Sequence, residues 1–289
     1  MPPGEIPQLL VNGLVAGTIL AVPAIGFTAI YAVLRFPNFT VASHATIGAF
    51  AGYVANTAGG FPAWAAVGVA FLVAGAAGVI NDEVVLKPLR PSGALTAAIA
   101  AVALTIALEN VIRFIWGNDL RGYALPLRRD WQWAGLRIGP QQVENLVIAV
   151  VAMGALFLFL AFTRTGKAMR AVADNPTLAG IKGINAEMVA RLVNFVGMGL
   201  AGIGGMLLGL DTSIDPLTGF RVILSVFAAA VVGGLGSIPG AVVGALAIGV
   251  AEELSLLSLA PAYRTAVGFV AILLVLTVRP RGILGERAF

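Results

Sequence analysis

The sequence predicts an all-α fold, a polytopic transmembrane bundle of eight or nine spans with a broken helix near residues 233–240. First, 59% of the residues are hydrophobic and only 11% are charged, against roughly 25% charged in a soluble domain. Second, several charge-free runs reach the ~20 residues that a helix needs to cross a bilayer. Third, the N-terminus lacks a basic leader and a cleavage site, so we expect the first apolar segment to be retained. Residues 1–289 then form a single transmembrane domain.

The individual spans follow from the charge-free runs and from glycine and proline punctuation. The run 36–81 is too long for one span, and NTAGGFP at 56–62 divides it. The run 222–251 is interrupted by GGLGSIPG, which leaves a piece of about 16 Å, half of a bilayer. Such a break is either part of a substrate pathway or a plain hairpin turn. The expected spans are 8–33, 38–55, 63–80, 94–114, 145–162, 189–210, 222–232, 241–257 and 263–278.

Between the fifth and sixth of these spans lies a long polar stretch, TRTGKAMRAVADNPTLAGIKGIN, at residues 163–185. Loops between spans are usually short, so a long loop with clear helix-boundary residues indicates a binding partner or a function. The alternative is an ordinary surface loop. We expect one helix over 164–172 and a second one capped by Asp174 or Asn175. Pro176 suits the first helical position and Gly183 the left-handed residue after the end. The second helix carries an apolar face of Leu178, Ala179 and Ile181.

Basic residues predict the orientation. If the loop 163–188 is cytoplasmic, the N-terminus lies outside and the C-terminus inside, and most of the 18 basic residues face the cytoplasm, as the positive-inside rule requires. The loop 116–143 is then extracytoplasmic, although it holds four arginines. Its Trp131, Trp133, Gly122 and Pro126 predict a small hairpin at the outer interface. The cytoplasmic set is Arg35, Lys87, Arg90, Arg164, Lys167, Arg170, Lys182, Arg191, Arg279, Arg281 and Arg287.

The scarcity of Cys, His and paired carboxylates argues against metal sites, disulfides and enzymatic chemistry. The chain has no Cys and one His, so disulfides, thiolate sites and metal sites are not expected. An enzyme needs a nucleophile–base or metal constellation, which isolated carboxylates do not supply. The net charge of +4 requires no nucleic-acid partner, because loop cations set membrane topology.

Polar residues within the spans are few. Glu109 and Asn110 lie late in the fourth span, where a charge marks a functional site by default. The alternative is an ion pair between Glu109 and Arg113 one turn later. We expect His44 to satisfy a helix contact, and Glu252 and Glu253 to be solvated near the outer end of their helix. Close helix packing is predicted by four GxxxG pairs: Gly13/Gly17, Gly48/Gly52, Gly205/Gly209 and Gly240/Gly244.

Four stretches of the sequence resemble one known family. RTGKAMRAVADNPTLAGIKGIN resembles the coupling loop of branched-chain amino-acid ABC-transporter permeases. GGLGSIPGAVVGALAIGVAE and RPRGILG resemble that family's C-terminal signatures, and NGLVAGTILAVPAIGFTAIYAVLRFPNF resembles its first span. The resemblance implies a multi-pass subunit of a prokaryotic inner-membrane importer. It assigns ATPase coupling to Ala173, Asp174, Asn175, Pro176, Leu178, Ala179, Gly180 and Gly183.

The resemblance also implies partners. They are two cytoplasmic ABC ATPases, a second homologous permease or a second copy of this chain, and an extracytoplasmic binding protein. The chain itself has no GxxxxGK[ST] phosphate loop, so we expect no cofactor in it and expect ATP to be bound by the partner subunits. An ion-coupled secondary transporter is the rival class, but it needs several carboxylates at mid-membrane.

Leucine, isoleucine and valine are the substrates that the resemblance implies, with urea or short amides as the alternative. Family members show an Ala-His-Gly-Glu-like run after the Asn-Phe pair, where this chain has Thr40, Val41, Ala42 and Ser43. A zwitterionic substrate needs a few hydrogen-bonding groups between apolar walls. The expected pathway residues are Asn38, Phe39, Ser43, Glu109, Asn110, Gly233, Gly234 and Gly236.

Overall fold

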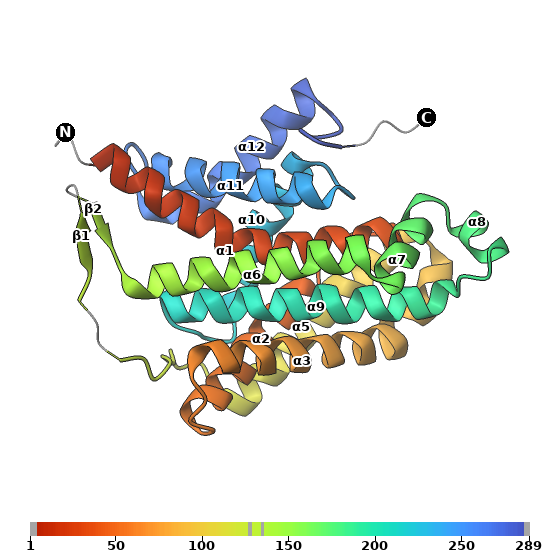
Figure 1. Cartoon of the computed structure of the whole chain (residues 1–289), viewed down its shortest axis with the longest axis horizontal. Helices are drawn as coiled ribbons and strands as arrows, with labels where there is room; N and C mark the ends of the chain where they lie inside the picture. Colours follow the sequence, from red (N-terminus) through yellow and green to blue (C-terminus); the bar gives the residue numbers. More distant parts are fainter. Residues whose placement is uncertain (1–4, 127–128, 134–135, 286–289) are drawn as a thin grey trace.

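The computed structural model describes residues 5–126, 129–133 and 136–285 and confirms an all-α, polytopic bundle. Figure 1 shows the long helices running side by side along one axis. Within the described residues, six helices are long and apolar enough to cross a membrane. Five of them are α1 (Glu5–Leu34), α3 (Ala63–Asn81), α5 (Ala94–Trp116), α6 (Pro140–Phe162) and α9 (Ala186–Asp211).

The sixth of these helices is α11 (Ile238–Ser255), and shorter helices complete the bundle. Three of the shorter ones are apolar segments of 15 to 17 residues: α2 (Val41–Thr57), α10 (Thr218–Gly233) and α12 (Arg264–Val278). A π-helical turn (Asp82–Leu86), α4 (Lys87–Leu89) and a 3-10 turn (Arg90–Ser92) prolong α3, and another 3-10 turn (Pro261–Tyr263) precedes α12. The remaining elements are α7 (Arg164–Asp174), α8 (Pro176–Ile181), β1 (Trp131–Trp133) and β2 (Leu136–Ile138).

Two helix starts differ from the prediction because side chains cap or pair there. The second span begins at Val41 rather than at Asn38, since the Asn38 side chain accepts hydrogen bonds from Thr40 before the helix starts. The helix expected from residue 222 begins at Thr218 instead. The charge-free run starts only after Arg221, but Arg221 lies within the helix and its guanidinium pairs with Asp215.

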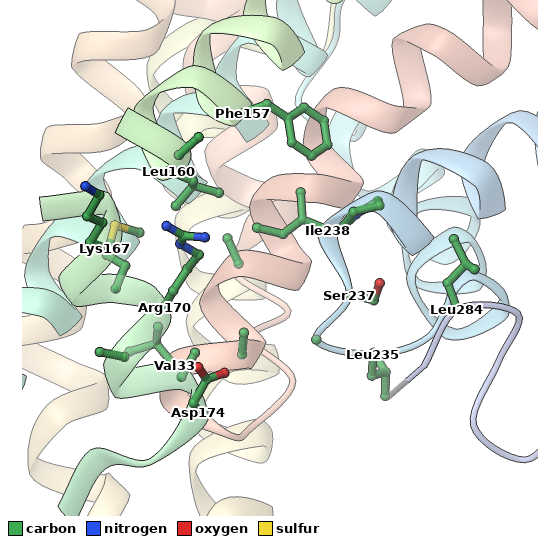
Figure 2. Close-up of a pocket in the computed structure, with 18 of the residues that line it drawn as sticks. Val33, Phe157, Leu160, Lys167, Arg170, Asp174, Leu235, Ser237, Ile238 and Leu284 are labelled. Atoms are coloured by element: carbon green, nitrogen blue, oxygen red, sulfur yellow. The ribbon is translucent and has the colours of Figure 1, made fainter. Parts of the chain in front are cut away.

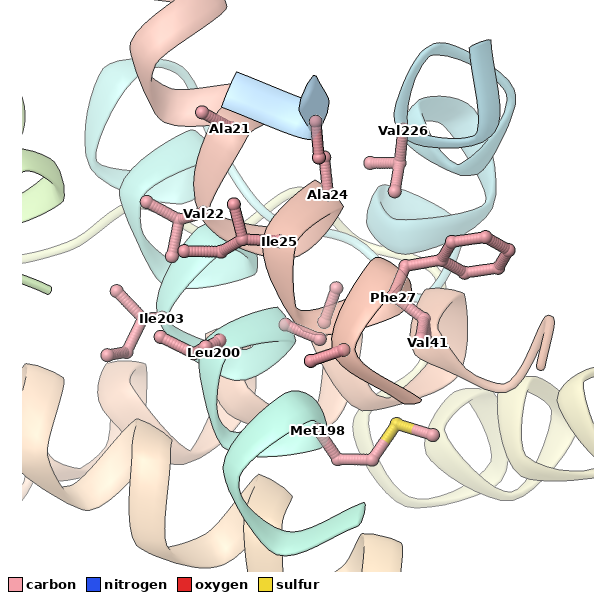
Figure 3. Packing of buried hydrophobic residues seen from close by; sticks show 14 of the residues in the cluster. Ala21, Val22, Ala24, Ile25, Phe27, Val41, Met198, Leu200, Ile203 and Val226 are labelled. Atoms are coloured by element: carbon pink, nitrogen blue, oxygen red, sulfur yellow. The ribbon is translucent and has the colours of Figure 1, made fainter. Parts of the chain in front are cut away.

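Helices α1 and α9 form the centre of the bundle. In the 18-residue apolar stretches of α1 and α9, 83% and 78% of the residues are buried. The corresponding shares in α5 and α6 are 28% and 22%, so these two helices lie at the periphery. Figure 3 shows side chains of α1, among them Val22 and Ile25, packed beside Leu200 and Ile203 of α9. The predicted glycine pairs are sites of close contact. A Cβ on Gly48 would lie 2.2 Å from the Cα of Gly202, so α2 and α9 pack backbone against backbone.

The ends of the bundle form two poles (Figure 1). The hairpin pole holds the predicted hairpin, which the structure confirms as antiparallel β1 and β2. The N-terminal end of α1 lies there too, because the Gln8 side chain donates to the Arg137 carbonyl at 2.9 Å. The loop pole, at the other end, holds residues 163–185. The C-terminal end of α1 lies at this pole, where the Arg35 guanidinium donates to the Ala173 carbonyl.

Candidate functional site

The loop at residues 163–185 folds into the two helices that the sequence predicts. The Thr163 hydroxyl caps α7 by accepting from the Gly166 N–H at 2.9 Å. Asn175, rather than Asp174, caps α8, since its side chain accepts from the Leu178 N–H at 2.9 Å. Pro176 is the first helical residue, and Gly183 has a φ of +82°. The local capping signals thus determine both helices.

The expected apolar face of α8 is divided between two sides. Leu178 and Ile181 are 53% and 76% exposed, whereas Ala179 is 4% exposed and belongs to the hydrophobic core. Ala179 also receives a 3.0 Å hydrogen bond on its carbonyl from the Ile184 N–H, which closes the loop onto itself. Of these three residues, Leu178 and Ile181 therefore remain as an exposed apolar surface on α8.

Two contacts attach α7 to the bundle. A Cβ on Gly166 would lie 2.3 Å from the Phe159 carbonyl oxygen, so α7 folds back tightly against α6. On its other side, the Arg35 guanidinium donates to the Ala173 carbonyl. Arg35 has a φ of +59° and is the only residue other than glycine with positive φ in the described chain. This contact is not among those predicted from the sequence, and an arginine directly after an apolar span is the signal that could have indicated it.

Asn38, Phe39 and Ser43 lie together in the interior. Asn38 is 1% exposed, and its side-chain Nδ2 has no hydrogen-bond partner in the described part of the chain. The Ser43 hydroxyl donates to the Thr40 carbonyl at 2.9 Å. The Phe39 ring lies 5.7 Å from that of Phe227 on α10. A buried amide donor beside an aromatic wall is therefore present at the start of α2.

Glu109 and Asn110 lie on α5, one turn beyond Thr105, whose hydroxyl donates to the Phe39 carbonyl at 3.1 Å. Glu109 forms a 3.1 Å ion pair with Arg113, which is the alternative that the sequence left open. Asn110 is exposed, and its Nδ2 donates to the Ile106 carbonyl at 2.8 Å. Asn110 thus faces the outside of this chain rather than its interior.

Gly233, Gly234 and Gly236 form the turn between α10 and α11. Gly234 and Gly236 have φ values of +113° and +91°, and the Ser237 hydroxyl caps α11 by accepting from the Gly240 N–H. A Cβ on Gly233 would lie 2.0 Å from the Gly240 carbonyl oxygen, so the two helices double back on each other. The interruption is a tight turn between two helices at the loop pole.

His44, Glu252 and Glu253 have structural partners. His44 is fully buried; its Nδ1 lies 2.7 Å from the Thr40 carbonyl and its Nε2 lies 3.1 Å from Asn81, which confirms the expected helix contact. The expectation that Glu252 and Glu253 are solvated is wrong, since they are 7% and 8% exposed. Arg264 pairs with Glu253 at 2.6 Å and with Glu252 at 3.5 Å. Among the described residues there is no cluster of three or more potential metal ligands.

Comparisons with known proteins agree along nearly the whole chain. A family model described as "Branched-chain amino acid transport system / permease component" matches residues 9–277. The high-affinity branched-chain amino acid transport system permease protein LivH of Salmonella typhimurium is 35% identical, covering 96% of this chain and 95% of that protein. The corresponding protein BraD of Pseudomonas aeruginosa is 33% identical, with the same coverage.

The fold also has a counterpart among solved structures. PsaBC from Streptococcus pneumoniae, solved in complex with Fab, superposes with a TM-score of 0.50 and 14% identity, covering 95% of this chain and 93% of that chain. At this identity the likeness concerns the fold alone.

Proposed function

This chain belongs to the family of branched-chain amino acid transport system permease components, and we propose that it is a membrane-spanning subunit of an ABC importer for leucine, isoleucine and valine. The observation that carries the proposal is the family match over residues 9–277, nearly the complete bundle. The relatives are named as permease proteins, a class without catalytic chemistry of its own. Urea or a short amide is the alternative cargo within the same transporter class.

The proposed coupling surface is α8. Its exposed Leu178 and Ile181 give an ATPase an apolar contact, and the Asn175 cap and Pro176 fix the helix start. Displacement of α8 reaches the bundle by two routes, directly into α9 and through α7 to Arg35 at the end of α1. ATP is bound by two partner ATPases, and this chain holds no cofactor. A second permease, or a second copy, and an extracytoplasmic binding protein complete the importer.

The proposed topology places the loop pole in the cytoplasm and the hairpin pole outside. The N-terminus is then outside and the C-terminus inside, and the chain crosses the inner membrane nine times, with α10 counted as one pass. The Arg121 and Ile214 backbones form an antiparallel bridge, so the loops after α5 and α9 lie on one side. Lys87 pairs with Glu187 at 3.4 Å, so the start of α9 lies on the same side as the end of α3.

The proposed pathway passes the start of α2. The unpartnered Nδ2 of Asn38 supplies a donor for a substrate carboxylate, and Phe39 and Phe227 supply an apolar wall for an aliphatic side chain. Ser43 lies one turn further along α2, while Glu109 and Asn110 lie near Thr105 on α5. We place the cytoplasmic exit at the turn of Gly233, Gly234 and Gly236, where Gly236 has open space around it and glycine permits close approach of the backbone.

Purification of the tagged chain from its native membrane tests this assignment. We expect two ABC ATPases and a second permease, or a second copy of the chain, to co-purify. A secondary transporter needs an acidic coupling-ion site, and Glu109 is already engaged by Arg113. Recovery of the chain without any ATPase, under conditions in which another ABC importer from the same membrane stays intact, contradicts the proposal.

A further inference from the structure

A groove opens at the loop pole between α7 and the turn that joins α10 to α11 (Figure 2). Its volume is about 990 Å³, and it extends from the end of α1 to Leu284 of the C-terminal segment. Most of the wall is apolar and comes from α1, α6 and the start of α11. The apolar lining includes Ala29, Ala32, Val33, Phe157, Leu160 and Ile238.

The groove also carries an excess of positive charge. Arg35, Lys167 and Arg170 line it, against the single carboxylate of Asp174. Arg35 already donates to the Ala173 carbonyl, whereas Lys167 and Arg170 have no ion-pair or hydrogen-bond partner for their side chains in the described part of the chain. Figure 2 shows the Arg170 guanidinium directed away from Asp174 and toward the level of Leu160. Two cations are therefore available to an anionic ligand.

The position of α7 places these cations at a membrane boundary. The helix follows α6 directly, and α6 is an apolar helix of 23 residues that exposes Leu158 and Phe162. One face of α7 buries Met169 and Val172, and the opposite face presents Lys167 and Arg170. A basic amphipathic helix at the end of a span is typical of the interface between headgroups and water. The groove thus offers hydrocarbon contact at bilayer depth and cations at headgroup level.

We propose that this groove binds an anionic phospholipid, with its phosphate between Lys167 and Arg170 and its acyl chains along Phe157, Leu160 and Ile238. Basic pockets between membrane helices on the cytoplasmic side suit anionic headgroups. A carboxylate of a protein partner matches the cations but leaves the apolar wall uncovered. The exposed Leu178 and Ile181 of α8 do not line the groove, so a lipid there leaves the proposed ATPase contact free.

A bound lipid would join two parts of the chain that this groove separates. It would contact α7 on one side and Ser237 and Ile238 on the other, two segments of the loop pole. Lipid binding here depends on the placement of α6 in a bilayer and on the proposed cytoplasmic position of the loop pole, and it does not depend on the substrate. Failure of lipid binding therefore leaves the proposed transport function untouched.

Native mass spectrometry of the purified complete transporter, with phosphatidylglycerol or phosphatidylcholine of the same acyl chains added, tests the proposal. We expect the wild type to retain phosphatidylglycerol preferentially. Each cation near a membrane surface contributes about 1 kcal/mol, or roughly five-fold in affinity. The double variant K167Q/R170Q should therefore bind phosphatidylglycerol roughly twenty-five-fold more weakly. The matched control is R164Q/K182Q, which removes the same charge from exposed positions outside the groove and should bind as the wild type does.

A second variant tests the apolar part of the site. Ala32→Phe leaves every cation in place but fills the groove beside α1, and it should also release phosphatidylglycerol. Equal binding of the two lipids by the wild type, or equal losses in K167Q/R170Q and its control, overturns the proposal. Competition by inorganic phosphate combined with full binding by Ala32→Phe also overturns it, because the groove would then be an anion site without a lipid.

Discussion

The carbonyl of Val232, in the last turn of α10, accepts a 2.8 Å hydrogen bond from the backbone N–H of Ile283. The next N–H, of Leu284, donates to the Gly233 carbonyl at 2.9 Å. The last carbonyls of a helix have no partner within that helix, so the C-terminal segment caps α10. The two stretches that resemble C-terminal family signatures are therefore in direct contact.

Gly282→Val should destabilise the chain through this cap. Gly282 has a φ of +79°, and a Cβ there would lie 2.6 Å from the backbone N of Gly234. We expect a loss of roughly 1–3 kcal/mol, the range for strain at such a backbone position. Thermal unfolding of the purified protein measures it. Gly122→Val is the matched control, because Gly122 has open space around it, and an equal loss in both variants would refute the role of the cap.

Replacement of both Leu178 and Ile181 by Asp should uncouple ATP hydrolysis from uptake. These exposed side chains form the apolar surface of α8, and a charged surface there should not dock an ATPase. We expect insertion and bundle stability to be unchanged, while uptake falls at least ten-fold. Thr177→Asp, at an exposed polar position of the same helix, should transport normally.

Ala179→Asp, by contrast, should damage folding rather than coupling. Ala179 is 4% exposed and lies in the core, where an unpaired carboxylate costs several kcal/mol. We expect reduced amounts of the protein in the membrane, measured by quantitative immunoblotting. Normal amounts of an inactive Ala179→Asp protein would show that this residue contacts the partner instead.

Single cysteines should reveal the orientation, because the natural chain contains no Cys. A Cys at Thr177, at the loop pole, should react only with thiol probes that reach the cytoplasm. A Cys at Gly122, at the hairpin pole, should react with impermeant probes added outside intact cells. The reverse pattern would invert the proposed topology and remove α8 from the reach of an ATPase.

Asn38→Ala should impair substrate binding without preventing assembly. A hydrogen bond to a charged group contributes about 1.5–3 kcal/mol, so we expect uptake affinity to fall roughly ten- to hundred-fold. The basal ATPase activity of the purified complex should persist. Thr57→Ala, at the exposed opposite end of α2, serves as the control. Wild-type affinity in the Asn38 variant would exclude this residue from the pathway.

The features predicted correctly depend on neighbours in the sequence. Asn175, Pro176 and Gly183 specify α8 through interactions within a few residues, and length and hydropathy alone specify helices such as α5 and α9. These signals need no knowledge of the rest of the fold. The hairpin β1–β2 belongs to the same category, since its two paired strands follow each other closely in the chain.

The features that the sequence did not reveal depend on distant partners. Arg264 and Ser225 reach the buried Glu252 from neighbouring segments. From sequence alone, a charged residue near a helix end is expected to be solvated, so this burial was not predicted. Arg221 lies inside α10, where it pairs with Asp215 from the preceding loop. The contact between Arg35 and Ala173 joins residues 138 positions apart. Pairings of this kind emerge only when the helices are packed in three dimensions.

Transport by the reconstituted complex tests the central claim most directly. The complete transporter is placed in liposomes with its binding protein on one side and ATP on the other, and labelled leucine uptake is measured. We predict uptake that requires hydrolysable ATP, persists when ion gradients are abolished, and is lost in the variant with Asp at positions 178 and 181. Leucine uptake driven by an ion gradient without ATP would contradict the assignment of this chain as an ABC permease.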